Sequence, residues 1–586
     1  MRRARLTNTT KGQSPDPNEE TDVMNQPLSR LRSTGGALLR GVAVAAICAL
    51  AQPAFAQDAN DPHRGGTMKL VAVASEGTLD PQINYTARYW QLYSFLYDGL
   101  VTFKKVGGAE STVVVPDLAA EMPVVSNDGK TYTFTLRKGV KFSNGKEVTP
   151  DDVVASFQRI FKVLSPTSGS FYGGIVGADK CLADADSCTL EGGISGDAAA
   201  NTVTINLVAP DAEFLFKLAV PHASVLPADA PAKDAGNTPI PGTGAYVIES
   251  YDPNASMVMV RNPSFTEWSK DAQPAGYPDR IEYAFGGTEE SAVNAIMNGQ
   301  ADWMYENPPT DRLAELSVSA ADQIKVSPLM AWWYAPLNVN IPPFDNVKAR
   351  QALTYAVDRD ALVSIFGGPA LAQPVCTILP PGFPGHEDRC DYTLDPGTEW
   401  SAPDMDKARQ LVEESGTKGQ KVTVVTDDSA ASRGVGTYLQ SVLSDLGYDA
   451  TVQTLSTDIQ FTYIQNTNNK VQISISQWYA DYPAASNFLN VLFGCDSFHP
   501  GSDSSINISG FCDKDLDARM KAAMALGVTD PEAANKDWAK IDADMMALAP
   551  AVPMFTPKDL DLIGKRVGNY EFSSQYHWLI ANSWVQ

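Results

Sequence analysis

A single carboxylate stands among aromatic residues late in the chain. Asp481 lies in the stretch WYADYP, beside Trp478 and Tyr479. Before it, apolar and polar residues alternate from 471 to 476, which is the period of a half-buried strand. Ligands of open α/β sheets bind beyond the carboxyl ends of the strands, and an acid among aromatic faces suits a cation with an apolar body. The pattern favours Asp481 as an anchor for an ammonium group, although an Asp before Pro483 is also an ordinary turn residue.

Further aromatic residues are candidates for lining the same site. Tyr172 follows Phe171 in a Gly-rich stretch, and Trp333 follows Trp332 just before a predicted strand at 334–340. Large aromatic residues dominate interiors as well as binding sites, so each alone is more often a core residue. The candidate ligand-binding residues are Asp481, Trp478, Tyr479, Tyr85, Tyr172 and Trp333.

Catalytic chemistry has little support in the sequence. The chain contains no G-x-S-x-G elbow, H-E-x-x-H motif, P-loop or G-x-G-x-x-G motif. The acids of DKDLDA at 513–518 are spaced like the start of an EF-hand loop, but Ala518 stands where that loop needs glycine. This segment is therefore predicted to begin a helix. We expect no enzyme activity, no cofactor and no metal.

Length and charge limit the possible partners. A chain of 586 residues exceeds what one hydrophobic core usually serves, so two or three domains are expected. The formal net charge is −24, and it becomes −27 without residues 1–56, which carry seven Lys and Arg against four Asp and Glu. Such a field repels nucleic acid and anionic membrane surfaces. It is compatible with a small or cationic ligand.

The N-terminus has the pattern of an export signal. Basic residues from Arg30 to Arg40 precede an apolar core at 41–51, and a small-x-small site at 54–56 precedes Gln57. We expect residues 1–56 to be leader and signal peptide, with translation starting at Met1 or Met24. The apolar core is too short to span a bilayer. The mature protein is expected to begin at Gln57 and to be periplasmic.

Six cysteines follow the predicted leader in three local pairs. Six cysteines permit 15 connectivities, but pairing of sequence neighbours closes the shortest surface loops in an exported chain. A metal site is the rival interpretation, which the absence of a C-x-x-C motif disfavours. The expected disulfides are Cys181 with Cys188, Cys376 with Cys390, and Cys495 with Cys512.

Hydrophobic periodicity predicts an α/β chain. A turn signal at Asn127-Asp128-Gly129 precedes the alternating residues 131–136, which predicts a hairpin. Thr149 offers an N-cap before Pro150 and two acidic residues. Two β-α-β units are predicted at 281–303 and 422–454. The buried stripe of the helix after Thr149 is expected to comprise Val153, Val154, Phe157, Ile160 and Phe161.

Five stretches in order resemble the dipeptide- and oligopeptide-binding family of solute-binding proteins of ABC importers, family 5. The resemblance covers essentially all of residues 66–586. The stretches are LDP at 79–81, PDLAAEMPVVSNDGKTYTFTLRKGVKFSNGKEVTPDDVVASFQRI at 116–160, TGAYVIESYDP at 243–253, PPFDNVKARQALTYAVDRDAL at 342–362 and WYADYP at 478–483.

The resemblance implies an α/β, two-lobed periplasmic-binding-protein fold with a hinge and an extra β-rich subdomain inserted in lobe one. The expected bounds are lobe one at 57–280 with the insert at about 104–205, lobe two at 281–558, and a return to lobe one at 559–586. It also implies a monomer that captures a peptide or other amine-bearing ligand between its lobes and delivers it to a membrane permease. An exported peptide-binding chaperone or receptor is the alternative function, and a hydrolase using Asp481 is a third.

The resemblance also assigns roles to site residues. In peptide-binding relatives, the Asp that matches Asp481 takes the α-ammonium of the ligand, and Tyr85, Trp478 and Tyr479 match segments along which the ligand lies. Some oligopeptide binders place an Arg six residues before this Asp, whereas this chain has Ile475. The far end of the ligand is therefore expected to be met by other residues, or to lack a carboxylate.

Overall fold

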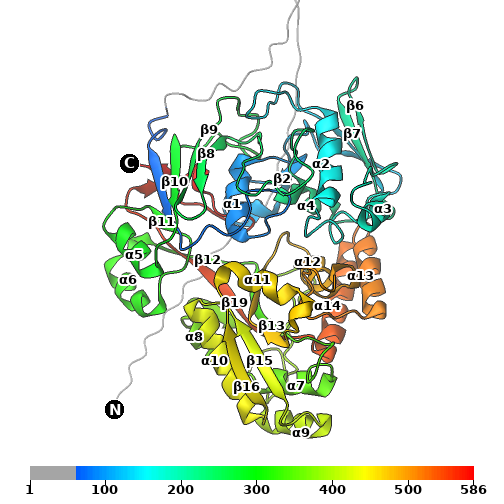
Figure 1. Ribbon diagram of the computed structural model, residues 1–586, viewed down its shortest axis with the longest axis vertical. Coiled ribbons are helices and arrows are strands. Elements are labelled where there is room, and N and C mark those ends of the chain that lie inside the picture. The colour runs from blue at the N-terminus through cyan, green and yellow to red at the C-terminus, as the bar shows by residue number, and fades with distance from the viewer. Residues whose placement is uncertain (1–60) are drawn as a thin grey trace, which may run out of the picture. The chain divides into compact units, whose positions relative to one another are not determined.

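Two large β-sheets organise residues 61–586, the part of the chain that the computed structural model describes (Figure 1). The strand order is β11-β1-β10-β9-β8 in the first sheet and β12-β19-β13-β18 in the second, where β14 also pairs with β19. The predicted leader and the cleavage site before Gln57 lie outside the described residues. Within 61–586, no helix has both the length and the apolar character needed to cross a membrane.

The first sheet is built around β1. This strand pairs in parallel with β10 on one side and β11 on the other, and β9 and β8 continue the sheet in antiparallel order. The predicted β-α-β unit at 281–303 is confirmed as β10, α5 and β11, and the Thr288 hydroxyl caps α5 by accepting a hydrogen bond from Ser291 N at 3.1 Å. The elements here are β1 (Thr67–Val71), α1 (Ala87–Leu96), β2 (Val101–Phe103), β3 (Val114–Pro116), α4 (Phe214–Ala219), β8 (Tyr246–Asp252), β9 (Ser256–Arg261), β10 (Arg280–Ala284), α5 (Glu289–Met297), β11 (Trp303–Met304) and α6 (Leu313–Ser319).

The strand partners move one expected domain boundary. A crossing near Arg280 was expected, but β10 and β11 both pair with β1, and Leu316 of α6 lies in one hydrophobic cluster with Val293 of α5. Sheet pairing joins segments far apart in sequence, so the local pattern could not reveal it. We propose that lobe one runs to about residue 320 and that lobe two begins at β12 (Ile324–Pro328).

A small four-stranded sheet, β4-β5-β7-β6, follows the β2–β3 pair and lies within the expected insert. The predicted hairpin is confirmed as β4 and β5, with Asn127, Asp128 and Gly129 at positive φ in its turn. The predicted helix is α2, whose cap includes a hydrogen bond from Thr149 N to Asp152 Oδ2 at 2.9 Å. We propose that the inserted subdomain at about 104–205 contains β4 (Val124–Ser126), β5 (Thr131–Thr135), α2 (Pro150–Lys162), α3 (Ala178–Ala183), β6 (Ile194–Asp197) and most of β7 (Thr202–Asn206).

The predicted stripe of α2 faces inward. Val153, Phe157, Ile160 and Phe161 are buried, and Val154 is half-buried. Arg159 on the same helix is also buried and ion-pairs with Asp80 of the LDP stretch, with Nη1 3.0 Å from Oδ1. This pair ties the insert to the loop that precedes Tyr85.

The second sheet is built around β19 (Ala551–Leu562). Its first half pairs with β13 and β14, and its second half pairs with β12, all in antiparallel order. The predicted strand at 334–340 is β13, which begins earlier, so Trp332 and Trp333 lie inside it. The elements on this sheet are β13 (Ala331–Pro336), α7 (Val347–Ala356), α8 (Arg359–Phe366), β14 (Ala372–Pro374) and β18 (Ser476–Tyr479).

A three-stranded parallel sheet, β16-β15-β17, completes the second lobe. The predicted β-α-β unit at 422–454 is confirmed, and Ser429 caps its helix by accepting a hydrogen bond from Ser432 N at 3.2 Å. The elements are α9 (Met405–Ser415), β15 (Lys421–Thr426), α10 (Ala430–Asp445), β16 (Asp449–Thr454), α11 (Thr457–Gln465), β17 (Ile473–Ser474), α12 (Ser486–Phe493), α13 (Lys514–Leu526) and α14 (Pro531–Leu548).

The expected single strand at 471–476 is in fact two short strands in different sheets. β17 pairs in parallel with β15, and β18 pairs antiparallel with β13. The chain therefore changes sheets at Ile475, and Asp481 follows β18 rather than a parallel strand.

The C-terminal residues return to the first sheet. Arg566 donates to both carboxylate oxygens of Asp302, each at 2.6 Å, and Gln91 of α1 donates to the Trp578 carbonyl at 2.8 Å. The return contains the strands β20 (Val567–Gly568), β21 (Phe572–Ser573), β22 (His577–Trp578) and β23 (Trp584–Val585).

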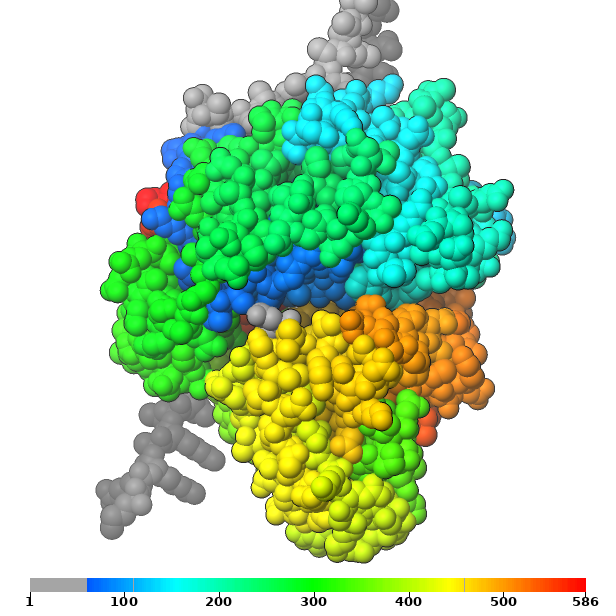
Figure 2. Space-filling view, in the orientation of Figure 1, coloured from blue at the N-terminus to red at the C-terminus, as the bar shows by residue number. Residues whose placement is uncertain are grey.

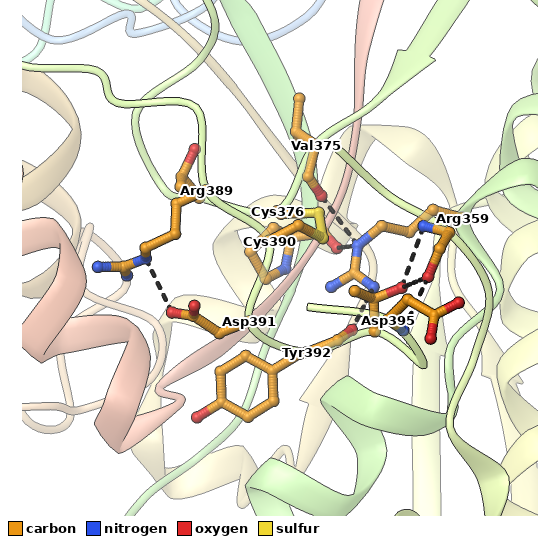
Figure 3. The surroundings of a disulfide bond; sticks show 12 residues. Arg359, Val375, Cys376, Arg389, Cys390, Asp391, Tyr392 and Asp395 are labelled. Carbon is orange, nitrogen blue, oxygen red and sulfur yellow. Dashed lines mark hydrogen bonds and ion pairs between the residues drawn. A yellow bond between two sulfur atoms is a disulfide. The ribbon is translucent and has the colours of Figure 1, made fainter. Parts of the chain in front are cut away.

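Three disulfides connect the expected cysteine pairs, Cys181–Cys188, Cys376–Cys390 and Cys495–Cys512. The second closes a loop around the buried guanidinium of Arg359 (Figure 3). Arg359 Nε donates to the carbonyl of Val375 at 2.9 Å, next to Cys376, and Nη1 lies 3.4 Å from the carbonyl of Tyr392, two residues beyond Cys390. This disulfide therefore holds together two segments that supply acceptors for one buried charge.

Peptide mapping of the unreduced protein is expected to recover these three pairs. Loops this short should each contribute about 2 to 3 kcal/mol to the free energy of unfolding, mainly through the unfolded chain. Free thiols or crossed pairs in the digest would contradict the assignment.

Candidate functional site

Asp481 lies where the two lobes meet. Oδ2 accepts a hydrogen bond from the Tyr85 hydroxyl of lobe one at 2.7 Å and another from Asn487 Nδ2 at 2.6 Å. No described residue donates to Oδ1, and no described cation forms an ion pair with Asp481. The carboxylate is therefore fixed by two donors and still has an oxygen available to a ligand.

Burial makes this carboxylate costly to ionise. Asp481 is only 8% exposed, and its burial raises its pKa from 3.8 to about 7, against the lowering effect of the hydrogen bonds from Asn487 and Tyr85. A buried carboxylate without a cation gains most from a ligand that brings a positive charge.

Asn487, near the start of α12, positions both Asp481 and Trp478. Its Oδ1 accepts from the backbone N of Asp481 at 2.9 Å and from Trp478 Nε1 at 3.2 Å, while its Nδ2 donates to the carboxylate. Asn487 was not among the residues predicted from the sequence. The amide six residues after the acid, at the start of a helix, was the available signal.

Tyr85 is held among aromatic rings from both lobes. Its ring centroid lies 5.2 Å from that of Trp90, 5.0 Å from His222 and 5.7 Å from Trp478. Burial, followed by the charge of Asp481, raises the pKa of Tyr85, so its hydroxyl stays protonated as a donor. The structure thus brings together three of the predicted residues, namely Tyr85, Trp478 and Asp481.

Two other candidates lie at the margins of the site. Tyr479, at the end of β18, is half-buried, and its ring lies 5.8 Å from that of His577. Tyr172 is fully buried, and its hydroxyl donates to the Lys217 carbonyl at 2.9 Å. Burial and then the Asp481 charge raise the pKa of Tyr172, so its hydroxyl stays protonated as a donor.

The structure does not bring Trp333 to Asp481. Trp333 packs against Phe366 and Phe555 inside the second lobe, with centroids at 5.3 and 5.4 Å. Neighbouring residues of a strand point to opposite faces, so Trp332 faces the other way and stacks on Tyr334 at 4.4 Å. Trp333 is therefore a core residue of lobe two.

A second contact between the lobes was also missed. Tyr482 of lobe two lies 5.4 Å from Phe171 and 6.2 Å from Phe216 between ring centroids, and Ser486 donates a short hydrogen bond to Glu213 Oε2. Burial raises the pKa of Glu213 to about 7, opposed by the charge of Lys217. These residues join the lobes beside the Asp481 site without contacting its carboxylate oxygens.

The insert also reaches lobe two. In the hairpin turn, Gly129 lies beside Val528 of the α13–α14 loop, and Ala212 lies beside Gly527 of the same loop. In Figure 2, the cyan surface of the insert meets the orange surface of the segment around residue 500.

Comparisons with known proteins agree with this architecture. The family profile described as bacterial extracellular solute-binding proteins, family 5 Middle, matches residues 113–499. The dipeptide-binding protein of Escherichia coli (strain K12) is 29% identical over 492 residues, which cover 78% of this chain and 84% of that protein.

Solved structures share the fold. The clavulanic acid biosynthesis oligopeptide binding protein 2 superimposes with a TM-score of 0.76 at 23% identity, covering 89% of this chain and 96% of that one. The Escherichia coli murein tripeptide binding protein MppA gives a TM-score of 0.75 at 22% identity, covering 89% and 98%. The fold is therefore the expected α/β, two-lobed binding-protein fold, and members of the matched family are binding proteins. The chain belongs to the bacterial extracellular solute-binding proteins, family 5.

Proposed function

We propose that this protein is the solute-capturing component of an ABC importer and that its ligand is a peptide or another solute with a free ammonium group. The family, and relatives named for dipeptide and oligopeptide binding, support the transport role. We further propose that it acts in the periplasm as a monomer, after removal of residues 1–56, and delivers its ligand to a membrane permease.

The buried Asp481 carboxylate is the observation that supports an amine-bearing ligand. Its Oδ2 is occupied by Tyr85 and Asn487, its Oδ1 has no described donor, and no described cation pairs with it. An ammonium bound at Oδ1 supplies the missing counter-charge, and the rings of Tyr85 and Trp478 provide apolar and cation–π contacts beside it.

The same residues give a reason why a bound ligand would favour the closed arrangement of the lobes. Tyr85 of lobe one contacts Asp481 of lobe two directly, and the Tyr482 ring packs against Phe171 and Phe216 of lobe one. A ligand shifts a conformational equilibrium only by its differential affinity for the two states. A ligand that contacts both Asp481 and the ring of Tyr85 gains both contacts only when the lobes are closed.

Native mass spectrometry of freshly purified protein identifies the cargo, and a matched ligand pair tests the anchor. The free-amine form should bind, whereas the N-acetylated form of the same peptide should bind at least about a hundredfold more weakly, because it leaves the carboxylate unpaired. Equal affinities for the two forms would exclude an ammonium anchor. Hydrolysis of the ligand during the experiment would instead indicate an enzyme.

The affinity for such a peptide is expected to have a maximum between about pH 7 and pH 8. Below pH 7 the free protein holds a proton on Asp481, whose pKa is raised to about 7, so the association constant should fall about tenfold per pH unit. Above pH 8 the peptide amine, with an ordinary pKa of about 7.7 to 8.0, loses its charge. Titration calorimetry from pH 5.5 to 9 checks the profile, and an affinity that is constant down to pH 5.5 would contradict it.

A further inference from the structure

We propose that His222 is a positioning residue of the ligand site, which fixes the Tyr85 ring so that its hydroxyl donates to Asp481. The inference rests on the proposed function only in calling this place a ligand site. His222 has no place in the mechanism above and contacts neither oxygen of Asp481.

A hydrogen bond joins His222 to the backbone beside Tyr85. His222 lies in a short 3-10 turn, Pro221–Ala223, and is fully buried. Its Nε2 lies 3.1 Å from the carbonyl oxygen of Asn84, the residue before Tyr85. Because a carbonyl only accepts, Nε2 carries the proton and donates. Trp90 Nε1 donates to the same carbonyl at 3.1 Å, so two rings hold one peptide group.

His222 also contacts the aromatic ring of Tyr85. The two rings that hold this peptide group also flank the Tyr85 ring, with His222 at 5.0 Å and Trp90 at 5.2 Å between centroids. The imidazole thus restricts the Tyr85 backbone by a hydrogen bond and its side chain by packing. Held in this way, the Tyr85 hydroxyl donates to Asp481 Oδ2 at 2.7 Å.

The imidazole of His222 is in turn held by Thr167. Nδ1 of His222 lies 2.8 Å from Thr167 Oγ1, in the inserted subdomain. With the proton on Nε2, Nδ1 accepts from the Thr167 hydroxyl. Burial lowers the pKa of His222 to about 3, so this neutral tautomer persists throughout the physiological pH range. The insert therefore acts on the ligand site through Thr167, His222 and Tyr85 in turn.

The protonation midpoint of Asp481 in the ligand-free protein reports whether Tyr85 is correctly placed. Tyr85, Tyr172, Tyr482 and Asn487 surround this carboxyl, and none of them changes charge near neutral pH. Glu213, which accepts from Ser486 and whose pKa burial raises to about 7, titrates in the same range, but its carboxylic acid band remains in Asp481→Asn. The donor from Tyr85 stabilises the carboxylate, so its loss should move the midpoint upward from about pH 7. Loss of one hydrogen bond to a charged group corresponds to about one pH unit.

Infrared difference titration measures this midpoint without any ligand. The carboxylic acid band of Asp481 is identified as the band that disappears from the spectrum of the Asp481→Asn variant. We expect Tyr85→Phe and His222→Leu each to raise the midpoint by about one unit, and the double variant to raise it no further, because both remove the same donor. His222→Gln, whose amide can replace both hydrogen bonds, should stay near the wild-type midpoint. Thr167→Val should give a smaller upward shift, and it tests the proposal if His222→Leu does not fold.

A matched control separates positioning from general stability. His386 also hydrogen-bonds a carbonyl, that of Leu379 at 2.8 Å, but in a loop of lobe two. His386→Gln is expected to change the melting temperature without moving the Asp481 midpoint. A wild-type midpoint in His222→Leu, or additive shifts in the double variant, would overturn the proposal. This titration contains no ligand, so its result does not depend on whether Asp481 binds an ammonium group. That question is answered separately, by the comparison of free-amine and N-acetylated peptides.

Discussion

Asp481→Asn is expected to weaken ligand binding and to stabilise the ligand-free protein. An ammonium that loses its buried counter-charge should cost about 3 to 5 kcal/mol, which is two to four decades of affinity for an amine-bearing ligand. The amide keeps nearly the same shape and can still accept from Tyr85 and Asn487. A neutral ligand should lose much less affinity.

The gain in stability follows from the raised pKa. Asp481 has a pKa of about 7 when folded and an ordinary value of 3.8 when unfolded, so between these values only the folded protein holds the proton. Stability is therefore lost as the pH rises from about 4 to 7, and above pH 7 the folded protein carries a desolvated charge. Removal of this charge at pH 8 should raise the free energy of unfolding by about 1 to 3 kcal/mol.

Calorimetric binding and thermal unfolding at pH 8, on the same preparations, test both effects. Asp542→Asn is the matched control, because this buried carboxylate of α14 accepts from the backbone N of Ile378 and of Leu379 in lobe two. The control should leave the affinity for the ligand unchanged, because Asp542 lies outside the Asp481 site. If Asp481→Asn binds within about threefold of wild type, Asp481 is not an ammonium anchor.

Arg159→Met is expected to give the largest loss of stability, about 3 to 5 kcal/mol. The substitution leaves Asp80 fully buried without its counter-charge, and Gln82 Oε1 loses its donor at 2.9 Å. Because the pair joins the insert to the loop before Tyr85, unfolding of this junction should also weaken ligand binding.

Denaturant unfolding of three variants checks the mechanism. The double variant Asp80→Asn/Arg159→Met should be more stable than Arg159→Met, since it no longer contains the buried, unpaired carboxylate of Asp80. Lys146→Met is the control, because the Lys146–Asp229 pair is exposed and its loss should leave stability nearly unchanged. An Arg159→Met protein as stable as wild type would show that the buried pair does not hold the insert to lobe one.

Local patterns predicted the elements and one half of the candidate site. Thr149, the turn at 127–129 and the two β-α-β units are short-range signals, and the structure contains each of them. The stretch around Asp481 was recognised because its residues are contiguous. Tyr85 was recognised by resemblance alone, since nothing near it in sequence indicates a partner almost 400 residues away.

The features that the sequence did not predict depend on contacts between segments far apart in the chain. The boundary that we propose near residue 320 differs from the expected one near Arg280, because β10 pairs with β1, a segment more than 200 residues away. Trp333 appeared equivalent to Trp332, and only the register of β13 against β18 and β19 shows which face of the sheet each one covers. Asn487 was missed because its contacts depend on α12 folding back over residue 481.

The return of residues 559–586 to the first sheet has a consequence for the order in which the protein folds. Lobe one contains the first described residues, but Asp302 is neutralised by Arg566 and Gln91 is bonded to Trp578, both of which emerge last. Each disulfide closes within 17 residues, so all three can form from short-range contacts. Lobe one, in contrast, is complete only after Arg566 and Trp578 pack against it, so a chain lacking these residues would carry its correct disulfides on an incomplete first domain.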